Sequence, residues 1–392
     1  MKKRIFAAML ALCLIFSAAF CVTASAEDTK LKFDKNGEFK ILHLCDCQDN
    51  YPAHEELLAF IDTVLKTYKP DLVVLGGDNT VGEEKTKELA VEELVKPFVE
   101  NEVYFTLVFG NHDREQNVDN ETLLKLYQKY GGEYCLAYNA DDSIDGIGNH
   151  YLPIYSSDGT EMKFNVWMFD SGSSIRDENG EWLGYDSVHT NQIEWYESES
   201  KKLVDGNGKM VNSLAFQHII VSDVYEAMFV KSPFKLGELT KEFDGNIYSF
   251  LPKTNNFSGF ICEFPCPGYI NYGQLDAMVE TGNVLGIFSG HDHINSFEVE
   301  IDGIRVINTP GATVKSYGNG FTRGARLLTI KEDDTSTFES ELIRYTDLAI
   351  QNADFAEVAG ISKFVAKITN AFGDVLLAFG KISGVFASIL YW

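Results

Sequence analysis

Two histidines stand one residue apart directly after an apolar run, and this combination limits the possible folds of the chain more than any other feature. Residues 284–289 read Val-Leu-Gly-Ile-Phe-Ser, a pattern typical of a buried strand, and Gly290 precedes His291 and His293. A strand that stops there aims imidazoles out of its carboxyl end. We therefore expect a metal site, provided that other strands supply matching ligands.

The same arrangement recurs at four other places in the chain. Apolar runs over 39–45, 72–75, 103–109 and 214–217 lead directly into polar side chains, which are Asp46 with Gln48, Asp78, Asn111 with His112, and His218. Ligands in open α/β sheets collect beyond the carboxyl ends of the strands, so these endings predict one shared site. Carboxylate, imidazole and amide groups suit Zn, Fe or Mn, and so many ligands favour two metal ions of unknown identity.

Helical and extended patterns alternate through the first third of the chain. Helical spacing of apolar residues over 53–68, 83–100 and 120–130 separates the first apolar runs, whereas strand-like runs follow one another between 295 and 345. This order predicts an α/β sandwich with mixed sheets. The stretch over 223–272 is irregular, and we expect it to consist of loops that frame the site.

The first residues carry an export pattern. Lys2, Lys3 and Arg4 precede an apolar run over 5–22 and small residues over 24–26, which predicts a signal peptide over 1–26 and a secreted protein. A retained membrane anchor is the less favoured alternative. The formal net charge of −25 opposes binding of the whole molecule to nucleic-acid backbones or anionic membranes, so we expect no nucleic-acid-binding surface.

The last residues form a separate amphipathic segment. We expect a main domain over 27–345 and a helical tail over 346–392 that keeps one apolar face. The main domain, a membrane interface or a partner helix could cover this face, and we favour an accessory helix with peripheral membrane contact. A spanning helix over 372–392 would place Asp374 and Lys381 in lipid, at considerable cost.

The polar endings and their flanking residues resemble a known motif set. Asp46, Gly77-Asp78, Gly110-Asn111-His112-Asp113, His218 and Gly290-His291-Asp292-His293 resemble, in this order, the motifs of the calcineurin-like metallophosphoesterases. Residues 216–219, 290–295 and 323–326 resemble the purple-acid-phosphatase-like branch, in its secreted bacterial type. The resemblance implies a four-layer α-β-β-α sandwich with two mixed β-sheets and a hydrolase that acts on phosphate esters.

The resemblance also implies a role for each motif residue. Asp46 and His293 would hold the first metal ion, Asp78 would bridge both ions, and Asn111, His218 and His291 would hold the second. A hydroxide between the ions would attack phosphorus in line, His112 would protonate the leaving oxygen, and Asp113 would orient the ring of His112.

The chain departs from the family at one ligand of the first metal ion. The family pattern is Asp-x-His, where this chain has Asp46-Cys47-Gln48. Glutamine offers an oxygen but no imidazole nitrogen, so we expect Gln48 to bind the first ion more weakly or to favour a harder ion such as Mn or Mg. Asp49 or His43 could compensate, although His43 stands an odd number of residues before Asp46 and is expected to face away.

Two other readings of the function stay open. The same metal ions could serve a nucleotidase or a lipid-headgroup phosphodiesterase, which would differ only in the substrate. The second alternative is a non-catalytic metal-binding homologue, in which Gln48 would be a first sign that catalytic activity has been lost. His112 and Asp113 argue against it, since neither is needed merely to hold metal. Among the aromatic residues, Tyr225 is the first that we would test for a role in a substrate pocket.

Overall fold

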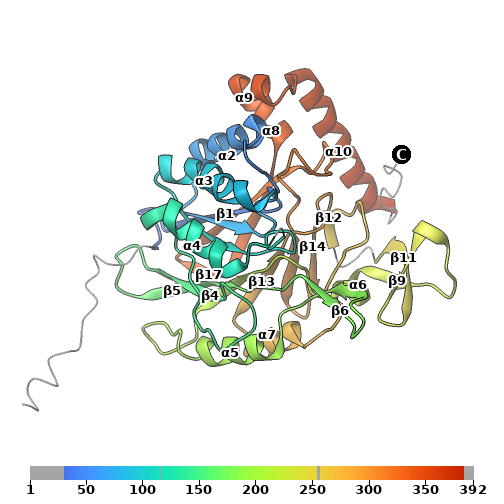
Figure 1. The fold of residues 1–392 in the computed structure, drawn as a ribbon, viewed down its shortest axis with the longest axis horizontal. Coiled ribbons are helices and arrows are strands. Elements are labelled where there is room, and N and C mark those ends of the chain that lie inside the picture. The colour runs from blue at the N-terminus through green and yellow to red at the C-terminus, as the bar shows by residue number, and fades with distance from the viewer. Residues whose placement is uncertain (1–30, 116, 254–256, 384–392) are drawn as a thin grey trace, which may run out of the picture.

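The computed structural model describes residues 31–383 except 116 and 254–256, and the side chains as far as 377. The predicted signal peptide therefore lies outside the described residues. Two large mixed sheets lie face to face, and helices cover both outer faces (Figure 1). This arrangement confirms the predicted four-layer α-β-β-α sandwich.

The first sheet carries the early strand–helix units of the chain. Its order is β17-β16-β1-β2-β3, in which β1, β2 and β3 run parallel and the other two pair antiparallel. The strands are β1 (Glu38–Leu44), β2 (Leu72–Gly76), β3 (Tyr104–Val108), β16 (Gly324–Lys331) and β17 (Asp334–Arg344). The helices on its outer face include α2 (Glu55–Tyr68), α3 (Glu84–Glu100) and α4 (Asn120–Gly131), with η2 (Gly132–Tyr134) after them.

The second sheet carries the later strands. Its order is β12-β14-β15-β13-β8-β5-β4, with a parallel centre formed by β15, β13, β8 and β5. The strands are β4 (His150–Tyr155), β5 (Met162–Met168), β8 (Asn212–Phe216), β12 (Phe257–Phe260), β13 (Val284–Ser289), β14 (Ser296–Ile301) and β15 (Ile304–Asn308). Its outer face is covered by α5 (Thr190–Ser200) and α7 (Gln274–Thr281).

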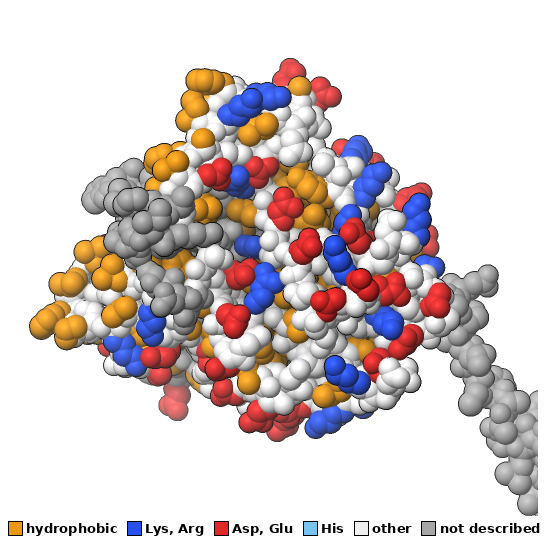
Figure 2. Space-filling view, turned by 180° about the vertical axis from the view of Figure 1, so that it is seen from behind, with side chains coloured by type: hydrophobic (Ala, Val, Ile, Leu, Met, Phe, Trp, Pro, Cys, Tyr) orange, Lys and Arg blue, Asp and Glu red, His pale blue; other side chains and the backbone are white. Residues whose placement is uncertain are grey.

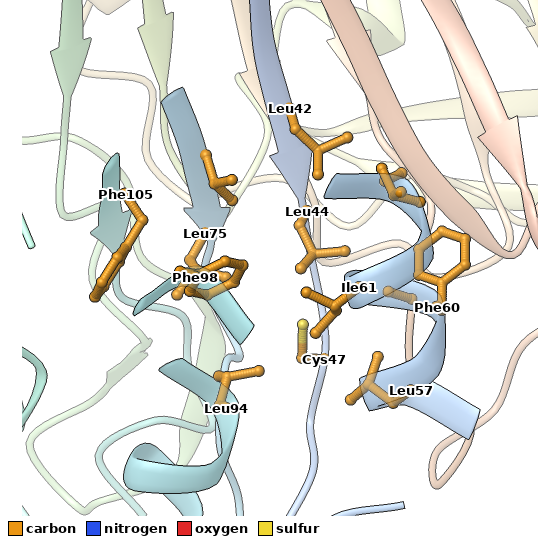
Figure 3. Packing of buried hydrophobic residues seen from close by; sticks show 14 of the residues in the cluster. Leu42, Leu44, Cys47, Leu57, Phe60, Ile61, Leu75, Leu94, Phe98 and Phe105 are labelled. Carbon is orange, nitrogen blue, oxygen red and sulfur yellow. The ribbon is translucent and has the colours of Figure 1, made fainter. Parts of the chain in front are cut away.

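Three hydrophobic clusters fill the three spaces between the layers. Successive side chains of a strand point to opposite faces, so Ile41 faces the second sheet while Leu42 faces the helices. In the outer cluster, Leu42 and Leu44 meet Phe60 of α2, and Phe98 of α3 lies over Phe105 (Figure 3). Because both faces of β1 are buried, the strand has little freedom to shift its register.

The segment over 223–272 is more regular than the sequence indicates, and the expectation of loops is wrong for much of it. It contains α6 (Val224–Met228) and a small antiparallel sheet of β9 (Phe229–Lys231), β10 (Thr240–Phe243) and β11 (Asn246–Pro252), with η3 (Gly237–Leu239) between the first two strands. Such short strands show little alternation of apolar and polar residues, so the pattern is hard to recognise in the sequence.

Three helices follow the last strand. They are α8 (Tyr345–Gln351), α9 (Ala353–Val358) and α10 (Lys363–Ser383). Leu348 of α8 and Phe355 of α9 are buried in the same cluster as Phe60 of α2, so these two helices complete the helical layer on the first sheet. Within the described part of the chain, no helix combines the length and hydropathy that a membrane span requires.

Candidate metal centre

The strand endings singled out in the sequence converge on one place between the two sheets. Two groups of buried side chains have ligand atoms that all lie within 4.8 Å of one another. The first group contains Asp46, Asp78 and His293, and the second contains Asp78, His218 and His291. Asp78 belongs to both groups. The arrangement could therefore hold two metal ions that share one carboxylate.

In the second group, hydrogen bonds orient the imidazole of His218. Its Nδ1 lies 2.9 Å from the carbonyl oxygen of Gly76, and its Nε2 lies 3.3 Å from Oδ2 of Asp78 and 3.2 Å from Oδ1 of Asn111. A backbone acceptor at Nδ1 selects the tautomer whose Nε2 lone pair can bind metal. Nε2 of His291 is buried and has no hydrogen-bond partner among the described residues. A buried, unpartnered nitrogen beside carboxylates fits a metal ligand.

In the first group, contacts on both ring nitrogens hold the imidazole of His293. Its Nε2 lies 3.4 Å from Oδ1 of Asp46, and its Nδ1 lies 3.0 Å from the carbonyl oxygen of Tyr317. The ring of Tyr317 stacks on the imidazole with centroids 4.2 Å apart. Asp46 also accepts a hydrogen bond of 3.0 Å from the backbone N–H of His291, which ties the first motif to the last.

Gln48 lies in this site, but its amide nitrogen faces Asp78. Nε2 of Gln48 donates to Oδ2 of Asp78 at 2.9 Å, the same oxygen that lies nearest His218. Asp49 is turned away, because it accepts hydrogen bonds from the backbone N–H and Nδ1 of His54 at the start of α2. His43 binds Oγ1 of Thr309 at 2.8 Å. Neither residue therefore reaches the place where the family has its histidine.

The pKa values of the buried ionisable groups show that the site favours positive charge. Burial disfavours a charge on His218, but the carboxylate of Asp78 outweighs it and raises the pKa of the imidazole to about 10. Burial, with further repulsion from His218, lowers the pKa of His291 to about 3. The buried carboxylates thus favour positive charge in the cluster, which a bound cation would supply. Carboxylate oxygens, imidazole nitrogens and an amide oxygen form a donor set that fits borderline divalent ions.

Glycines in the motifs allow the strand endings to approach so closely. Gly77 has φ +90°, and a Cβ there would lie 2.5 Å from Nδ1 of His218. A Cβ at Gly110 would lie 2.2 Å from Oδ1 of Asp78. Each glycine that precedes a ligand therefore makes room for a ligand that comes from a different strand.

The contacts of His112 contradict the role that was expected for Asp113. Asp113 does not orient the ring of His112, because its carboxylate accepts hydrogen bonds from the backbone N–H groups of Asn79, Thr80 and Gly110. Nδ1 of His112 instead lies 2.8 Å from Oε1 of Glu115. Asp113 thus holds together the loops after β2 and β3, and burial, followed by repulsion from Asp78, raises its pKa to about 6.

Two residues of the site were missed in the sequence. Glu115 stands three residues after His112, and only this spacing hinted at a contact. Tyr317 comes from a loop after β15 that wraps around the first motif, with the backbone N–H of Thr313 donating to the carbonyl oxygen of Asp46 at 2.9 Å. Nothing in the local sequence pairs this loop with His293.

Comparisons with known proteins agree with this geometry. The profile of the family described as "Calcineurin-like phosphoesterase" matches residues 39–295. A protein of Arabidopsis thaliana named "Probable inactive purple acid phosphatase 14" is 28% identical, over 85% of this chain and 86% of its own length. "Phosphatase DCR2" of Saccharomyces cerevisiae is 25% identical, over 74% of this chain and 49% of its own length.

Among solved structures, a dimetal phosphatase from Danio rerio aligns with a TM-score of 0.45 and 14% identity, over 78% of this chain and 98% of its own. The family assignment rests on the profile, which covers all five strand endings from Asp46 to His293. The chain therefore belongs to the calcineurin-like phosphoesterase family.

Proposed function

We propose that the protein is a catalytically active, metal-dependent hydrolase of phosphate esters. The observation that carries the proposal is the pair of buried ligand groups around Asp78, with Nε2 of His112 4.0 Å from Oδ2 of the same carboxylate. The side chain of His112 is 42% exposed, so it can meet a substrate at the edge of the site. Two bound cations would supply Lewis acidity toward phosphoryl oxygens and lower the pKa of an attacking water.

His112 is the residue that we assign to proton transfer. Its Nδ1 lies 2.8 Å from Oε1 of Glu115, a contact that would orient the ring so that Nε2 can give a proton to the departing oxygen. General acid catalysis of this kind contributes about 10²- to 10⁴-fold in rate. Asp113 acts on His112 only through the backbone of its loop.

A cavity of about 1000 Å³ lies beside the metal centre and would hold the alcohol part of the ester. Its walls come from β7 (Trp182–Tyr185), which pairs with β6 (Ser174–Arg176), and from the segment over 222–271. Tyr185 belongs to this wall and also contacts the ring of His291, with centroids 4.3 Å apart. Tyr225 lines the cavity too, but its hydroxyl already donates to the carbonyl oxygen of Pro265. Tyr225→Phe therefore tests whether this wall contributes to substrate binding. An unchanged Michaelis constant would contradict a role of Tyr225 in the pocket.

The decisive experiment compares variants on a panel of substrates with added Mn. Phosphomonoesters, nucleotides and headgroup diesters separate a simple phosphatase from a nucleotidase or a lipid-headgroup phosphodiesterase. We expect His112→Ala to lower kcat by about 10²-fold or more and Asp78→Asn to abolish turnover. His54→Ala is the matched control, because His54 is also about half exposed and also pairs with a carboxylate, but lies outside the site.

A non-catalytic metal-binding protein is the second candidate function. The observation in its favour is the amide nitrogen of Gln48 on Asp78, together with relatives whose names include "probable inactive". Equal rates for the wild type, His112→Ala and Asp78→Asn on every substrate would favour this alternative over catalysis.

We further propose that the protein is exported, on the strength of the N-terminal pattern. The purified mature protein should then begin at Glu27, as N-terminal sequencing would show. A chain that retains residues 1–26 after passage through the secreting cell would contradict the proposal.

A further inference from the structure

Helix α10 buries small residues and exposes large apolar ones. Ala366 and Gly373 of α10 are buried against the domain, and Nδ2 of Asn370 donates to Oδ1 of Asp347 at 2.6 Å. Its small and polar residues thus hold the helix in place. Its large apolar residues point to solvent instead, with exposed fractions of 74% for Phe364 and 55% for Ile368. Amphipathic helices of globular proteins usually bury the apolar face.

A second protrusion has the same character and comes from a distant part of the sequence. The small β9–β11 sheet, with the loop around η3, exposes Phe234 at 69% and Leu236, Leu239 and Leu251 at 54–58%. Both protrusions lie toward the same end of the long axis of the molecule (Figure 1). Figure 2 shows apolar side chains gathered on both of them. Large apolar side chains clustered in this way typically mark an interaction surface.

The local charge distinguishes these protrusions from the rest of the chain. The full chain carries −25, yet residues 361–392 contain three lysines and one aspartate, and residues 229–253 contain four lysines and three acidic residues. These two segments thus carry small net positive charges of +2 and +1 in a strongly acidic protein. Residues 384–392 carry no charged side chain and end in Tyr391-Trp392, residue types that favour the membrane–water interface.

We propose that these two protrusions together dock the protein on the surface of an anionic lipid bilayer. Apolar side chains would enter the headgroup region, while Lys363 and Lys367 would face the lipid phosphates. The acidic remainder of the molecule is repelled by such a surface, which orients the protein with this end toward the lipid. The inference is independent of the catalytic proposal.

The test is hydrogen–deuterium exchange of the full chain with and without vesicles of phosphatidylglycerol and phosphatidylcholine. We expect slower exchange in peptides from 229–253 and from 361–377 when anionic vesicles are present, and loss of this protection at high salt. Pure phosphatidylcholine vesicles should protect much less. The readout is local, so binding through the N-terminal apolar run does not produce it.

Variants give the second measurement. Phe364→Ser with Ile368→Ser, and Phe234→Ser with Leu236→Ser, should each lower vesicle partitioning about tenfold. Leu89→Ser with Val204→Ser removes partly exposed apolar side chains elsewhere and should not. Unchanged exchange in both segments would overturn the proposal. Protection that needs no lipid and grows with protein concentration would also overturn it, because a second copy of the chain would then cover the surface.

Discussion

Four residues of the candidate metal centre adopt backbone conformations that residues other than glycine usually avoid. Asp46, Gln48, Asp78 and His291 have φ values of 49°, 41°, 50° and 71°. Each such conformation costs about 1–3 kcal/mol and persists only where neighbours hold it. Backbone hydrogen bonds from Asp46 to Gly77 and from Gln48 to Asp78 hold it here, at 3.0 and 2.8 Å. The turned backbone is what brings these side chains together between the sheets.

Replacing Gln48 should change how firmly the first metal ion is held. Gln48→His would add an imidazole nitrogen and remove the amide nitrogen that now donates to Asp78. We expect about tenfold tighter binding of Mn or Zn at the first site, equivalent to about 1.4 kcal/mol. Metal content after dialysis against graded chelator measures the effect. Gln48→Leu removes the amide without adding a ligand, and equal metal retention in both variants would contradict the assignment.

The buried imidazole of His43 should make the protein sensitive to acid. Burial, with repulsion from Arg326, lowers its pKa from 6.5 to about 3. Between these values the unfolded chain binds a proton that the folded chain does not, so stability is lost as the pH falls below about 6.5.

His43→Asn should remove the loss of unfolding free energy that protonation of His43 causes, which is about 2 kcal/mol between pH 6.5 and pH 5. Urea unfolding at pH 7 and pH 5 provides the comparison, and the variant should lose less stability on acidification even if it is weaker at pH 7. His54→Asn, where the side chain is 41% exposed, is the control for the replacement of a histidine by asparagine. Parallel pH profiles for His43→Asn and the wild type would show that His43 is not the source.

At the scale of elements, the loops after the strands matter more than the strands themselves. The loop after β2 passes so close to β8 that only a glycine fits at position 77. The loop after β3 is tied to it through Asp113. A change in one loop is therefore transmitted to ligands carried by another strand.

Gly77→Ala and Gly180→Ala should separate this close approach from backbone strain alone. Both glycines have positive φ, +90° and +83°, but a Cβ at Gly180 would meet nothing within 4 Å. We expect Gly180→Ala to cost about 1 kcal/mol of unfolding free energy and Gly77→Ala at least twice as much, with a loss of bound metal. Denaturant unfolding and metal analysis measure both effects. A similar, small loss in both variants would mean that His218 simply moves aside.

At the scale of the whole molecule, the C-terminal segment begins in the hydrophobic core and ends in a helix with an exposed outer face. Tyr345 stacks on Phe60 of α2 with centroids 4.0 Å apart, and Phe355 lies over the same ring. The beginning of the segment is thus part of the core, whereas the outer face of α10 is not. The predicted domain boundary at residue 345 stays a prediction, but the core extends past it.

The stability of the protein should depend on one phenylalanine of this segment and hardly at all on another. Phe355 is 2% exposed and Phe364 is 74% exposed. Phe355→Ala should lower the unfolding free energy by about 3–5 kcal/mol, because it leaves a cavity between α2 and α9. Phe364→Ala should change it by no more than about 0.5 kcal/mol. Thermal and denaturant unfolding provide the measurement, and a large effect at Phe364 would show that something in the protein covers it.

The sequence by itself determined the parts of this protein that depend on local patterns. Runs of apolar residues placed β1, β2, β3, β8 and β13, and the polar residues shortly after each strand supplied the candidate ligands, because a strand that ends in a buried sheet leaves its next side chains at the sheet edge. The order of these endings also identified the family.

Tertiary structure alone decided which residues meet across long separations. Glu115 rather than Asp113 contacts His112, Tyr317 stacks on His293, and α10 turns its apolar face outward. Each of these outcomes depends on the packing of segments that are joined by loops rather than on the pattern of one segment. Local periodicity states which face of an element is apolar, but only the packed molecule decides what lies against that face.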